Sequence, residues 1–451
     1  MRISSDNDKL TWAVSLASNS PHLDVAVESC LTLRYLNAMT AEIYASSQNH
    51  VRSALAKRGI DFEGRGLPVS LRPTVISARM ADEIKRDLSV VRNCINRLIE
   101  TLRADLHSRK NSILVNFFSF YEKWYPLILQ ERRCIDDIML MRFDTARTAR
   151  HVWKAMEPNS ACPGGVIHCA FSRDAWASSE IGRTLCSGLE LVNAAIDDPY
   201  YFVRFLDGLT ETRENRNVAI CNYRGVYTHE LNSLQKASEK LQSQGVTAGR
   251  IVVCDARDIH VDKNVVLAAG APVGLIYNKL DPLAVAPEAP DLQHWIAASR
   301  ADGCDFLNSF GAFYIGEAKS VFAALWREDI QREIGVSAEE KAAIKRRICQ
   351  TRRVCDLELA AMREVIDNRH KYVLKKDAVT RGIGVVVGHE TDARHWADTV
   401  DAYRDRNGVV QEAIDIPTRA LWKQPTAAGA WKAITAISAP MRSSSARRSP
   451  A

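Results

Sequence analysis

The feature that most constrains the fold is a strand–helix–strand pattern in the middle of the chain. Residues 218–221 and 251–254 are short apolar runs typical of buried strands. Between them, residues 229–243 carry leucines at helical spacing, and Gly245 is placed to end this helix. A helix that joins two strands in this way carries the chain back across the sheet, so the strands are expected to lie parallel. A third run, 273–277, is expected to extend this α/β sheet.

The first third of the chain is predicted to be helical. Ser77 is a suitable N-cap for a long helix, because the apolar residues after it recur every three or four positions. They form one apolar stripe, which comprises Met80, Ile84, Leu88, Val91, Ile95, Leu98 and Leu102. A less regular helix is expected over 22–57, and an aromatic-rich helix that packs in the core over 111–129.

The last folded part is predicted to be a small α+β lobe. It comprises strands at 372–375, 385–387 and 409–412, a loop with Gly382 and Gly384, and a helix at 391–403. Before this lobe, Ser337 and Glu340 form a capping box at the start of the strongly basic segment 337–353. The basic face of this segment is expected to lie in solvent.

The net charge of +6 is confined to the tail. Residues 418–451 contain six of the 60 basic residues and no acidic one, so the remaining 54 basic residues balance the 54 acidic residues of the body. A folded nucleic-acid interface would need its basic patch in the body, so no nucleic-acid partner is expected. The alternative, contact through the tail and the basic segment, is the weaker hypothesis. We expect the tail to be weakly ordered and residues 443–451 to be disordered.

The sequence predicts a cytoplasmic protein with no membrane partner. No uninterrupted apolar stretch reaches the about 18–20 residues that cross a bilayer. The first ten residues include Asp6 and Asp8, where a secretory signal would be apolar. The eleven cysteines never occur as a CxxC pair, which favours reduced thiols over disulfides or a zinc site.

Two phosphate-binding motifs can be excluded. Gly311 and Gly316 precede Lys319 as in a P-loop, but two residues separate the second glycine from the lysine, so the backbone could not wrap a phosphate in the usual way. Gly382, Gly384 and Gly388 have the spacing GxGxxxG within a predicted hairpin, which does not match a Rossmann fingerprint.

Several weaker signals remain, each with an ordinary structural alternative. Lys375 ends a predicted strand and precedes the glycine loop, which could lay backbone N–H groups over phosphate oxygens, although most such loops are plain hairpins. Lys319 opens a predicted helix. Gln411 and Glu412 end a predicted strand and could bond an adenine edge, the alternative being an ordinary edge strand.

A second group of signals offers oxygen ligands. Asp144, Glu157 and Asn159 lie close together in the sequence and precede a Pro-Gly-Gly turn at 163–165. Carboxylate and amide oxygens suit Mg²⁺ that carries phosphates.

Together and in this order, these residues resemble the circularly permuted ATP-grasp family, which includes glutathionylspermidine synthase-like proteins and amino-acid ligases. The likeness runs from about Arg142 to Pro417. In that family the metal-binding half precedes the nucleotide-binding half, with a βαβ pre-ATP-grasp region between them. The resemblance implies a helical N-terminal region (1–106), a metal-binding half (107–215), a pre-ATP-grasp region (216–310), a nucleotide-binding half (311–417) and a basic tail (418–451).

The resemblance also implies a role for each candidate residue. Asp144, Glu157 and Asn159 would hold Mg²⁺, and Arg142 would lie beside the transferred phosphoryl group. The ATP contacts would be Lys319 and Lys375 at the phosphates, Gly382 and Gly384 in the lid, and Gln411 and Glu412 at the adenine hinge. Arg257 and Tyr277, at the ends of predicted strands, are weaker candidates for substrate contacts.

The implied activity is an ATP- and Mg²⁺-dependent ligase. It would join the carboxylate of an amino acid or small peptide to an amine through an acyl phosphate. Residues 376–381 replace the proline and glycine-rich lid that is usual in the family. The alternative is therefore a degenerate member that binds nucleotide or a partner without catalysis.

Overall fold

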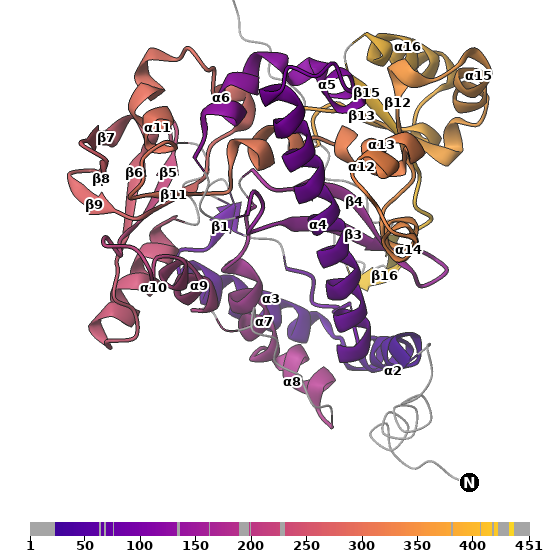
Figure 1. The fold of residues 1–451 in the computed structure, drawn as a ribbon. Coiled ribbons are helices and arrows are strands. Elements are labelled where there is room, and N and C mark those ends of the chain that lie inside the picture. Colours follow the sequence, from indigo (N-terminus) through magenta and orange to yellow (C-terminus); the bar gives the residue numbers. More distant parts are fainter. Residues whose placement is uncertain are drawn as a thin grey trace, which may run out of the picture.

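The longest element of the computed structural model is helix α4 (Ala78–His107), which runs between a parallel sheet and an antiparallel lobe (Figure 1). The Ser77 side chain caps it by accepting a hydrogen bond from the Met80 N–H at 3.2 Å, and the predicted apolar stripe is buried from Val91 to Leu102. The long helix is therefore confirmed. The structure describes residues 23–62, 65–66, 69–74, 76–132, 136–161, 163–188, 198, 200–225, 231–379, 382–405, 407–416, 419–422 and 433–436.

The predicted βαβ unit is confirmed. Strands β5 (Val218–Asn222) and β6 (Ile251–Asp255) pair in parallel, and α10 (Leu231–Ser243) connects them. Strands β10 (Leu275–Asn278) and β11 (Asp305–Leu307) complete a parallel sheet in the order β11-β10-β5-β6.

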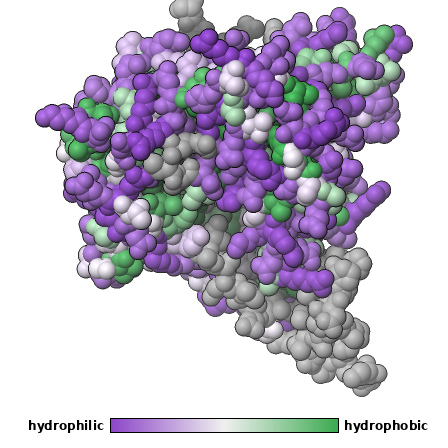
Figure 2. All heavy atoms as spheres, in the orientation of Figure 1, coloured by the Kyte–Doolittle hydropathy of each residue, from purple (hydrophilic) through white to green (hydrophobic). Residues whose placement is uncertain are grey.

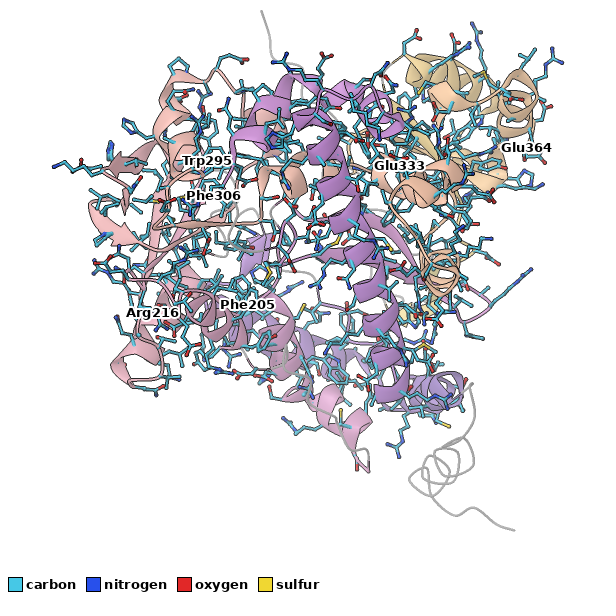
Figure 3. The ribbon with its side chains drawn as sticks, in the orientation of Figure 1. Phe205, Arg216, Trp295, Phe306, Glu333 and Glu364 are labelled. Atoms are coloured by element: carbon cyan, nitrogen blue, oxygen red, sulfur yellow. The ribbon has the colours of Figure 1, made fainter. Side chains whose placement is uncertain are left out.

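This parallel sheet is buried on both faces, as parallel sheets usually are. Val218 and Ile220 of β5 face a core that is also lined by α10 and by five other helices: α2 (Leu23–Ala38), α3 (Ala41–Ala56), α7 (His168–Ala177), α8 (Glu180–Cys186) and α9 (Tyr201–Leu209). Ala219 and Cys221 face a second core, lined by α4 and α11 (Gln293–Ala298). In that core Trp295 lies 5.5 Å from Phe306, measured between ring centroids (Figure 3).

The predicted strand 273–277 is wrong in part, because Gly274 divides it. Val273 ends β9, which belongs to a separate antiparallel sheet: β7 (Ile259–Asp262), β8 (Val265–Ala268) and β9 (Ala271–Val273). At Gly274 the backbone passes so close to Asn215 that a Cβ atom would lie 2.0 Å from the Asn215 carbonyl oxygen. Only a glycine allows this approach, and the chain changes sheets there.

The predicted helix 111–129 is also wrong as a single element. The segment forms three short pieces: α5 (Ile113–Phe117), the 3₁₀ helix η1 (Ser119–Trp124) and α6 (Tyr125–Gln130). Pro126 lies in the first turn of α6 and has no N–H to continue the preceding helix. Five of the six aromatic side chains, among them Phe117, Tyr121 and Trp124, are nonetheless buried as expected, whereas Phe120 is exposed.

The C-terminal α+β lobe is confirmed. Its antiparallel sheet has the order β12-β15-β13-β14, with β12 (Thr351–Arg353), β13 (Tyr372–Lys376), β14 (Val385–Val387) and β15 (Gly408–Glu412). Helices α15 (Leu359–Asp367) and α16 (Ala393–Arg404) cover one face, where Leu374, Trp396 and Val400 are buried. The opposite face carries Lys375 and Gln411 toward the rest of the molecule.

Three helices precede this lobe: α12 (Ser320–Trp326), α13 (Glu328–Glu333) and α14 (Ala338–Arg347). The capping box of Ser337 and Glu340 on α14 is confirmed. The expectation that its basic face lies in solvent is wrong for Arg347, which is buried; its guanidinium group binds the carboxylate of Asp87 on α4 at 2.7 Å. Arg346 binds the same carboxylate at 2.8 Å and remains exposed.

In the tail, the structure describes two short strands. Strands β16 (Arg419–Trp422) and β17 (Ala433–Ala436) pair in an antiparallel manner, as do β1 (Asp61–Phe62) and β2 (Arg65–Gly66) near the N-terminus. The predicted disorder at 443–451 lies outside the described residues. Figure 2 shows a mainly hydrophilic surface with small, separate apolar patches. Within the described ranges, no helix is both long and apolar enough to cross a membrane.

Candidate active site

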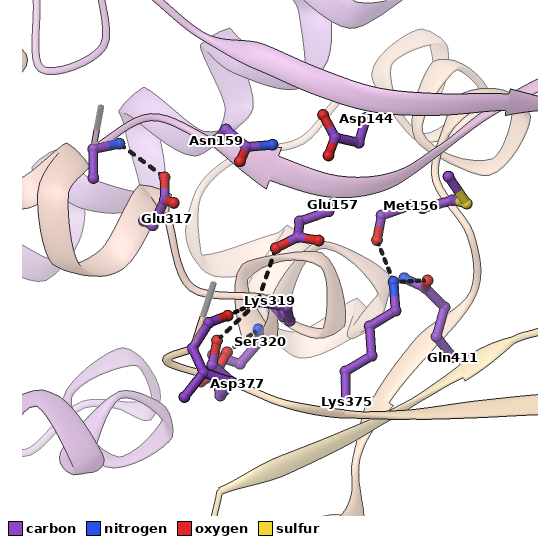
Figure 4. Close-up of polar contacts among 12 residues, drawn as sticks. Asp144, Met156, Glu157, Asn159, Glu317, Lys319, Ser320, Lys375, Asp377 and Gln411 are labelled. Atoms are coloured by element: carbon purple, nitrogen blue, oxygen red, sulfur yellow. Dashed lines mark hydrogen bonds and ion pairs between the residues drawn. The ribbon is translucent and has the colours of Figure 1, made fainter. Parts of the chain in front are cut away.

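The candidate site is built on a hairpin of β3 (Arg142–Arg147) and β4 (Trp153–Asn159). Arg142 pairs with Asn159 across the hairpin, and Asp144 pairs with Glu157. Residues directly opposite in an antiparallel pair, and residues two apart on one strand, project from the same face. All four side chains therefore share one face, and Arg142 binds Asp144 at 2.9 Å and Asn159 at 3.0 Å. Figure 4 shows Asp144, Glu157 and Asn159 together.

An irregularity in this hairpin brings in Lys375 from the C-terminal lobe. The register shifts after Asp144, so Met156 has no partner on β3. The Met156 carbonyl instead accepts a hydrogen bond from the Lys375 ammonium at 2.9 Å. The same ammonium donates to Gln411 Oε1 at 2.7 Å, and the Gln411 amide donates to Thr351 Oγ1 at 2.9 Å (Figure 4). Burial lowers the pKa of Lys375 to about 8, against the opposing effect of the Glu157 charge.

Lys319 reaches the hairpin from the start of α12. Its ammonium lies 2.9 Å from Glu157 Oε1 and also donates to the carbonyl oxygens of Asp377 and Val379. Lys319 is only 5% exposed. The structure thus brings both predicted phosphate-binding lysines to β4, with Glu157 bound to Lys319.

The side chains of the two predicted adenine-hinge residues do not share one site. Gln411 and Glu412 are consecutive in β15, so their side chains point to opposite faces of the sheet. Gln411 is buried and holds Lys375, whereas Glu412 accepts a hydrogen bond from the Gln350 N–H and pairs with Lys154 at 3.3 Å.

Asp377 is a buried carboxyl group that sequence reasoning missed. It accepts four hydrogen bonds: from the Ser320 N–H at 2.7 Å, the Ser320 hydroxyl at 2.6 Å, the Tyr121 hydroxyl at 3.1 Å and the Asn407 amide at 2.6 Å. Burial raises the pKa of Asp377 in spite of these donors. Asp377 therefore fixes the first residues of the predicted lid to α12.

Glu317 is a second carboxyl group that sequence reasoning missed. Its Oε2 atom accepts hydrogen bonds from the backbone N–H groups of Ser160 and Ala161, directly after β4 (Figure 4). Burial raises the pKa of Glu317 to about 7, and the two N–H groups and Lys319 oppose this shift. Glu317 lies in the segment 311–320, two residues before Lys319, and no motif in the sequence singles it out. The exclusion of a P-loop in this segment agrees with the structure, because a Cβ atom at Gly316 would lie 2.7 Å from Ser160 Oγ, so this glycine serves close packing.

The two predicted lid glycines occupy the turn between β13 and β14. Gly382 and Gly384 have φ angles of +71° and +70°, which favour glycine. The Gly384 carbonyl accepts a hydrogen bond from the Tyr403 hydroxyl at 2.8 Å, and a Cβ atom at Gly384 would lie 2.9 Å from the Lys376 side chain. Thr380 and Arg381 lie outside the described residues.

The base of the hairpin is fixed to the carboxyl ends of the parallel strands. Asn308, after β11, donates to the carbonyl oxygens of Leu140 and Ser160 at 2.6 and 2.7 Å. The Tyr277 hydroxyl, on β10, donates to the Pro163 carbonyl at 2.9 Å. Because β6 and β10 lie on opposite sides of β5, the strand order reverses here, and α/β proteins commonly bind ligands at such a point. Tyr277 thus has a structural partner, and Arg257 pairs with Asp255 at 2.8 Å.

The hairpin residues fit a divalent cation that carries phosphates. No cluster of three or more His, Cys, Asp and Glu side chains that could hold a metal occurs in the described part of the chain. The candidate set contains only two carboxylates, Asp144 and Glu157, with the amide of Asn159. This is a donor set that Mg²⁺ accepts when phosphates and waters complete its shell. At present Arg142 and Lys319 neutralise the two carboxylates.

No protein-family model and no curated protein matches the chain. Among solved structures it is similar to an apo glutathione synthetase-like effector from Globodera pallida, with 11% identity, a TM-score of 0.56, and coverage of 85% of this chain and 84% of that chain. D-alanyl-alanine synthetase A from Vibrio cholerae O1 biovar eltor aligns with 45% of this chain and 60% of its own at 10% identity, but its TM-score of 0.25 is too low to relate the folds. The chain thus shares the mixed α/β fold of a glutathione synthetase-like protein.

Proposed function

We propose that the protein is an ATP- and Mg²⁺-dependent ligase that joins a carboxylate to an amine, with an amino acid or small peptide as substrate. The observation that carries this proposal is the shared hairpin face of Arg142, Asp144, Glu157 and Asn159, with Lys319 bound to Glu157. The shared fold with a glutathione synthetase-like protein supports a ligase of this general kind. The circularly permuted ATP-grasp order is part of the same proposal.

The chemistry needs charge neutralisation more than it needs a nucleophilic side chain. A substrate carboxylate oxygen attacks the γ-phosphorus of ATP and ADP leaves; an amine then attacks the acyl carbon, phosphate leaves, and the amine loses a proton. Lys319, Lys375 and Arg142 would hold the negative oxygens in place during these steps. Asp144, Glu157 and Asn159 would hold Mg²⁺, which neutralises phosphate charge when it is bound.

The present contacts support a joint requirement for ATP and Mg²⁺. The Lys319 ammonium now contacts Glu157 and the carbonyl oxygens of Asp377 and Val379, so a phosphate must replace one of these three partners. A divalent cation at Glu157 would release Lys319 toward the phosphates. We therefore expect tight ATP binding only in the presence of the cation.

The test is incubation with ATP, Mg²⁺ and a panel of amino acids and amines. We expect ADP, phosphate and a new amide, and a loss of at least about 100-fold in ADP formation for Glu157→Ala and Lys375→Ala. Glu339→Ala, an exposed position on α14, is the matched control. If the two site variants form ADP as fast as the parent, the assignment is wrong.

A second candidate is a nucleotide-binding protein without catalysis. It is favoured by the four donors that hold Asp377 and by the two lid carbonyl groups that already bind Lys319. A thermal-shift series with ATP and Mg²⁺ separates the two candidates. Stabilisation without turnover on any substrate would favour this candidate, and turnover would reject it.

A further inference from the structure

A cavity lies at one edge of the C-terminal sheet, between the end of α12 and the edge strand β12 (Figure 1). Its volume of ≈ 520 Å³ is within the range of cavities that hold small molecules. We propose that it binds a small molecule that carries two anionic groups, carboxylates or phosphates, on a short carbon chain. Among the described residues, none that is assigned above to Mg²⁺ or ATP lines this cavity, so the proposal does not depend on the ligase activity.

The charged groups in the wall of the cavity favour an anion. They are three guanidinium groups and one carboxylate, from Arg327, Arg352, Arg353 and Asp356. Asp329 and Glu364, which pair with Arg327 and Arg352, do not line the cavity. A ligand therefore meets mainly N–H donors, and guanidinium groups suit the geometry of carboxylates and phosphates.

Arg352 is the least committed of the three arginines. The carboxylate with which it pairs in the described part of the chain is that of Glu364, at 3.6 Å, which is too long for a hydrogen bond. The Arg352 side chain is 36% exposed. An incoming anion can therefore bind Arg352 without replacing a short contact.

Arg353 and Arg327 are held in place and still keep donors. Arg353 donates through Nε and Nη2 to Asp356 at 2.8 and 2.6 Å, and through Nη1 to the Phe117 carbonyl. Arg327 donates through Nε and Nη2 to Asp329 at 3.0 and 2.6 Å, and through Nη1 to Asp356 at 3.4 Å. A guanidinium group has five N–H donors, so each Nη atom keeps one N–H for a ligand. Because both groups are already ordered, little side-chain entropy is lost on binding.

The rest of the wall supplies carbon. Ala323 and Leu357 are buried residues that line the cavity, together with the half-buried Trp326. The Trp326 Nε1 atom donates to the Cys349 carbonyl at 3.0 Å, so the indole offers a ligand ring carbon rather than an N–H group. Such a surface suits the carbon chain that joins two anionic groups.

Binding to the full chain can be measured by calorimetry without ATP and Mg²⁺, at constant ionic strength. The probes are succinate, ethane-1,2-diphosphonate and succinamate, which share the two-carbon chain. Succinamate has one carboxylate and one neutral amide. We expect at least one of the two dianions to bind about tenfold more tightly than succinamate, because its second anionic group forms charge-assisted hydrogen bonds. The tighter dianion identifies the natural group as a carboxylate or a phosphate. Dianions that bind no more tightly than succinamate would overturn the proposal.

Variants locate the bound dianion. Arg352→Gln should weaken it about tenfold, and Arg352→Lys should recover part of this loss, since lysine keeps the charge but not the planar fork. Arg327→Gln should weaken it about threefold. The matched control is Arg394→Gln, which is exposed on α16 and should leave the affinity unchanged.

Lys319→Ala distinguishes this cavity from the proposed nucleotide site. The variant should bind the dianion as tightly as the parent, because Lys319 does not line the cavity. Weaker binding by Lys319→Ala, with Arg352→Gln equal to Arg394→Gln, would assign the dianion to the phosphate-binding lysines and overturn the proposal. Dianion binding by a protein that never forms ADP would reject the ligase proposal alone.

Discussion

At the scale of single residues, the candidate site is defined by ionisable groups that are held away from water. Lys319, Lys375 and Asp377 are each less than about a tenth exposed. The two lysines donate to residues of β4, and Asp377 accepts from Ser320 of α12. Burial disfavours the charged form of such groups unless partners compensate for it. Burial lowers the pKa of Lys375 and raises the pKa of Asp377, so the partners of these two groups compensate for burial only in part.

Glu317 gives a pH-dependent prediction. Its pKa rises from 4.5 to about 7 on folding, so between these values the folded protein binds more protons than the unfolded chain, and stability falls as the pH rises. Glu317→Gln removes this titration and keeps an oxygen for the Ser160 and Ala161 N–H groups. We expect the free energy of unfolding of the variant, relative to the parent, to increase by up to about 3 kcal/mol between pH 4.5 and pH 8.

Urea denaturation at several pH values measures this difference. Glu339→Gln, exposed on α14, is the control and should show no such trend. A constant difference between Glu317→Gln and the parent across this pH range would contradict the prediction.

The sequence predicted the candidate residues only where they lie near one another along the chain. Asp144, Glu157 and Asn159 lie on one hairpin, so their spacing and order sufficed to bring them together. Asp377 and Glu317 could not be recognised, because their burial depends on Tyr121 and Ser160, which are distant in the sequence. The side chains of Gln411 and Glu412 point to opposite faces because successive residues of a strand alternate. The expectation that both residues contact adenine did not include this alternation.

At the scale of elements, regular apolar patterns were sufficient to predict helices and strands. The positions where an element is interrupted could not be predicted in this way. The helix that begins after Ser77 was predictable because its apolar stripe is regular, and the βαβ unit because its strands are short and apolar. The breaks at Pro126 and Gly274 depend on tertiary contacts, such as the approach of Gly274 to Asn215. The helix or strand propensity of a segment does not indicate such tertiary contacts.

The hairpin β3–β4 depends on one buried amide for its position. Asn308 donates to Leu140 and Ser160 and accepts from the N–H groups of Met139 and Leu140. Asn308→Ala would leave four backbone groups without these partners, so we expect a loss of about 2–4 kcal/mol in the free energy of unfolding and weaker ATP binding. Urea denaturation and an ATP titration measure the two effects. Asn93→Ala, exposed on α4, should change stability by less than about 0.5 kcal/mol, and equal losses for both variants would refute this role of Asn308.

At the scale of the whole molecule, the site combines parts that are far apart in the chain. The hairpin comes first in sequence, the parallel sheet follows, and Lys319 and the antiparallel lobe come last. Through charged side chains, helix α4 contacts the segment before the hairpin and helix α14, which precedes the antiparallel lobe. Arg103 binds Asp137 beside the hairpin at 2.7 Å, whereas Arg97 binds Glu340 on α14 at 2.8 Å. The relative position of the lysines and the hairpin thus depends on this helix.

Asp87 links α4 to α14 at two points, because its carboxylate binds both Arg346 and the buried Arg347. Asp87→Ala would leave Arg347 charged and unpaired in the interior, and we expect a loss of about 3 kcal/mol in the free energy of unfolding, measured by urea denaturation. Adding Arg347→Met to this variant removes the unpaired charge, so the double variant should be more stable than Asp87→Ala alone. Glu83→Ala breaks the exposed pair with Arg79 and should cost less than about 0.5 kcal/mol. If the losses of Asp87→Ala and Arg347→Met simply add in the double variant, the two residues are not coupled and α4 does not hold the C-terminal part through this pair.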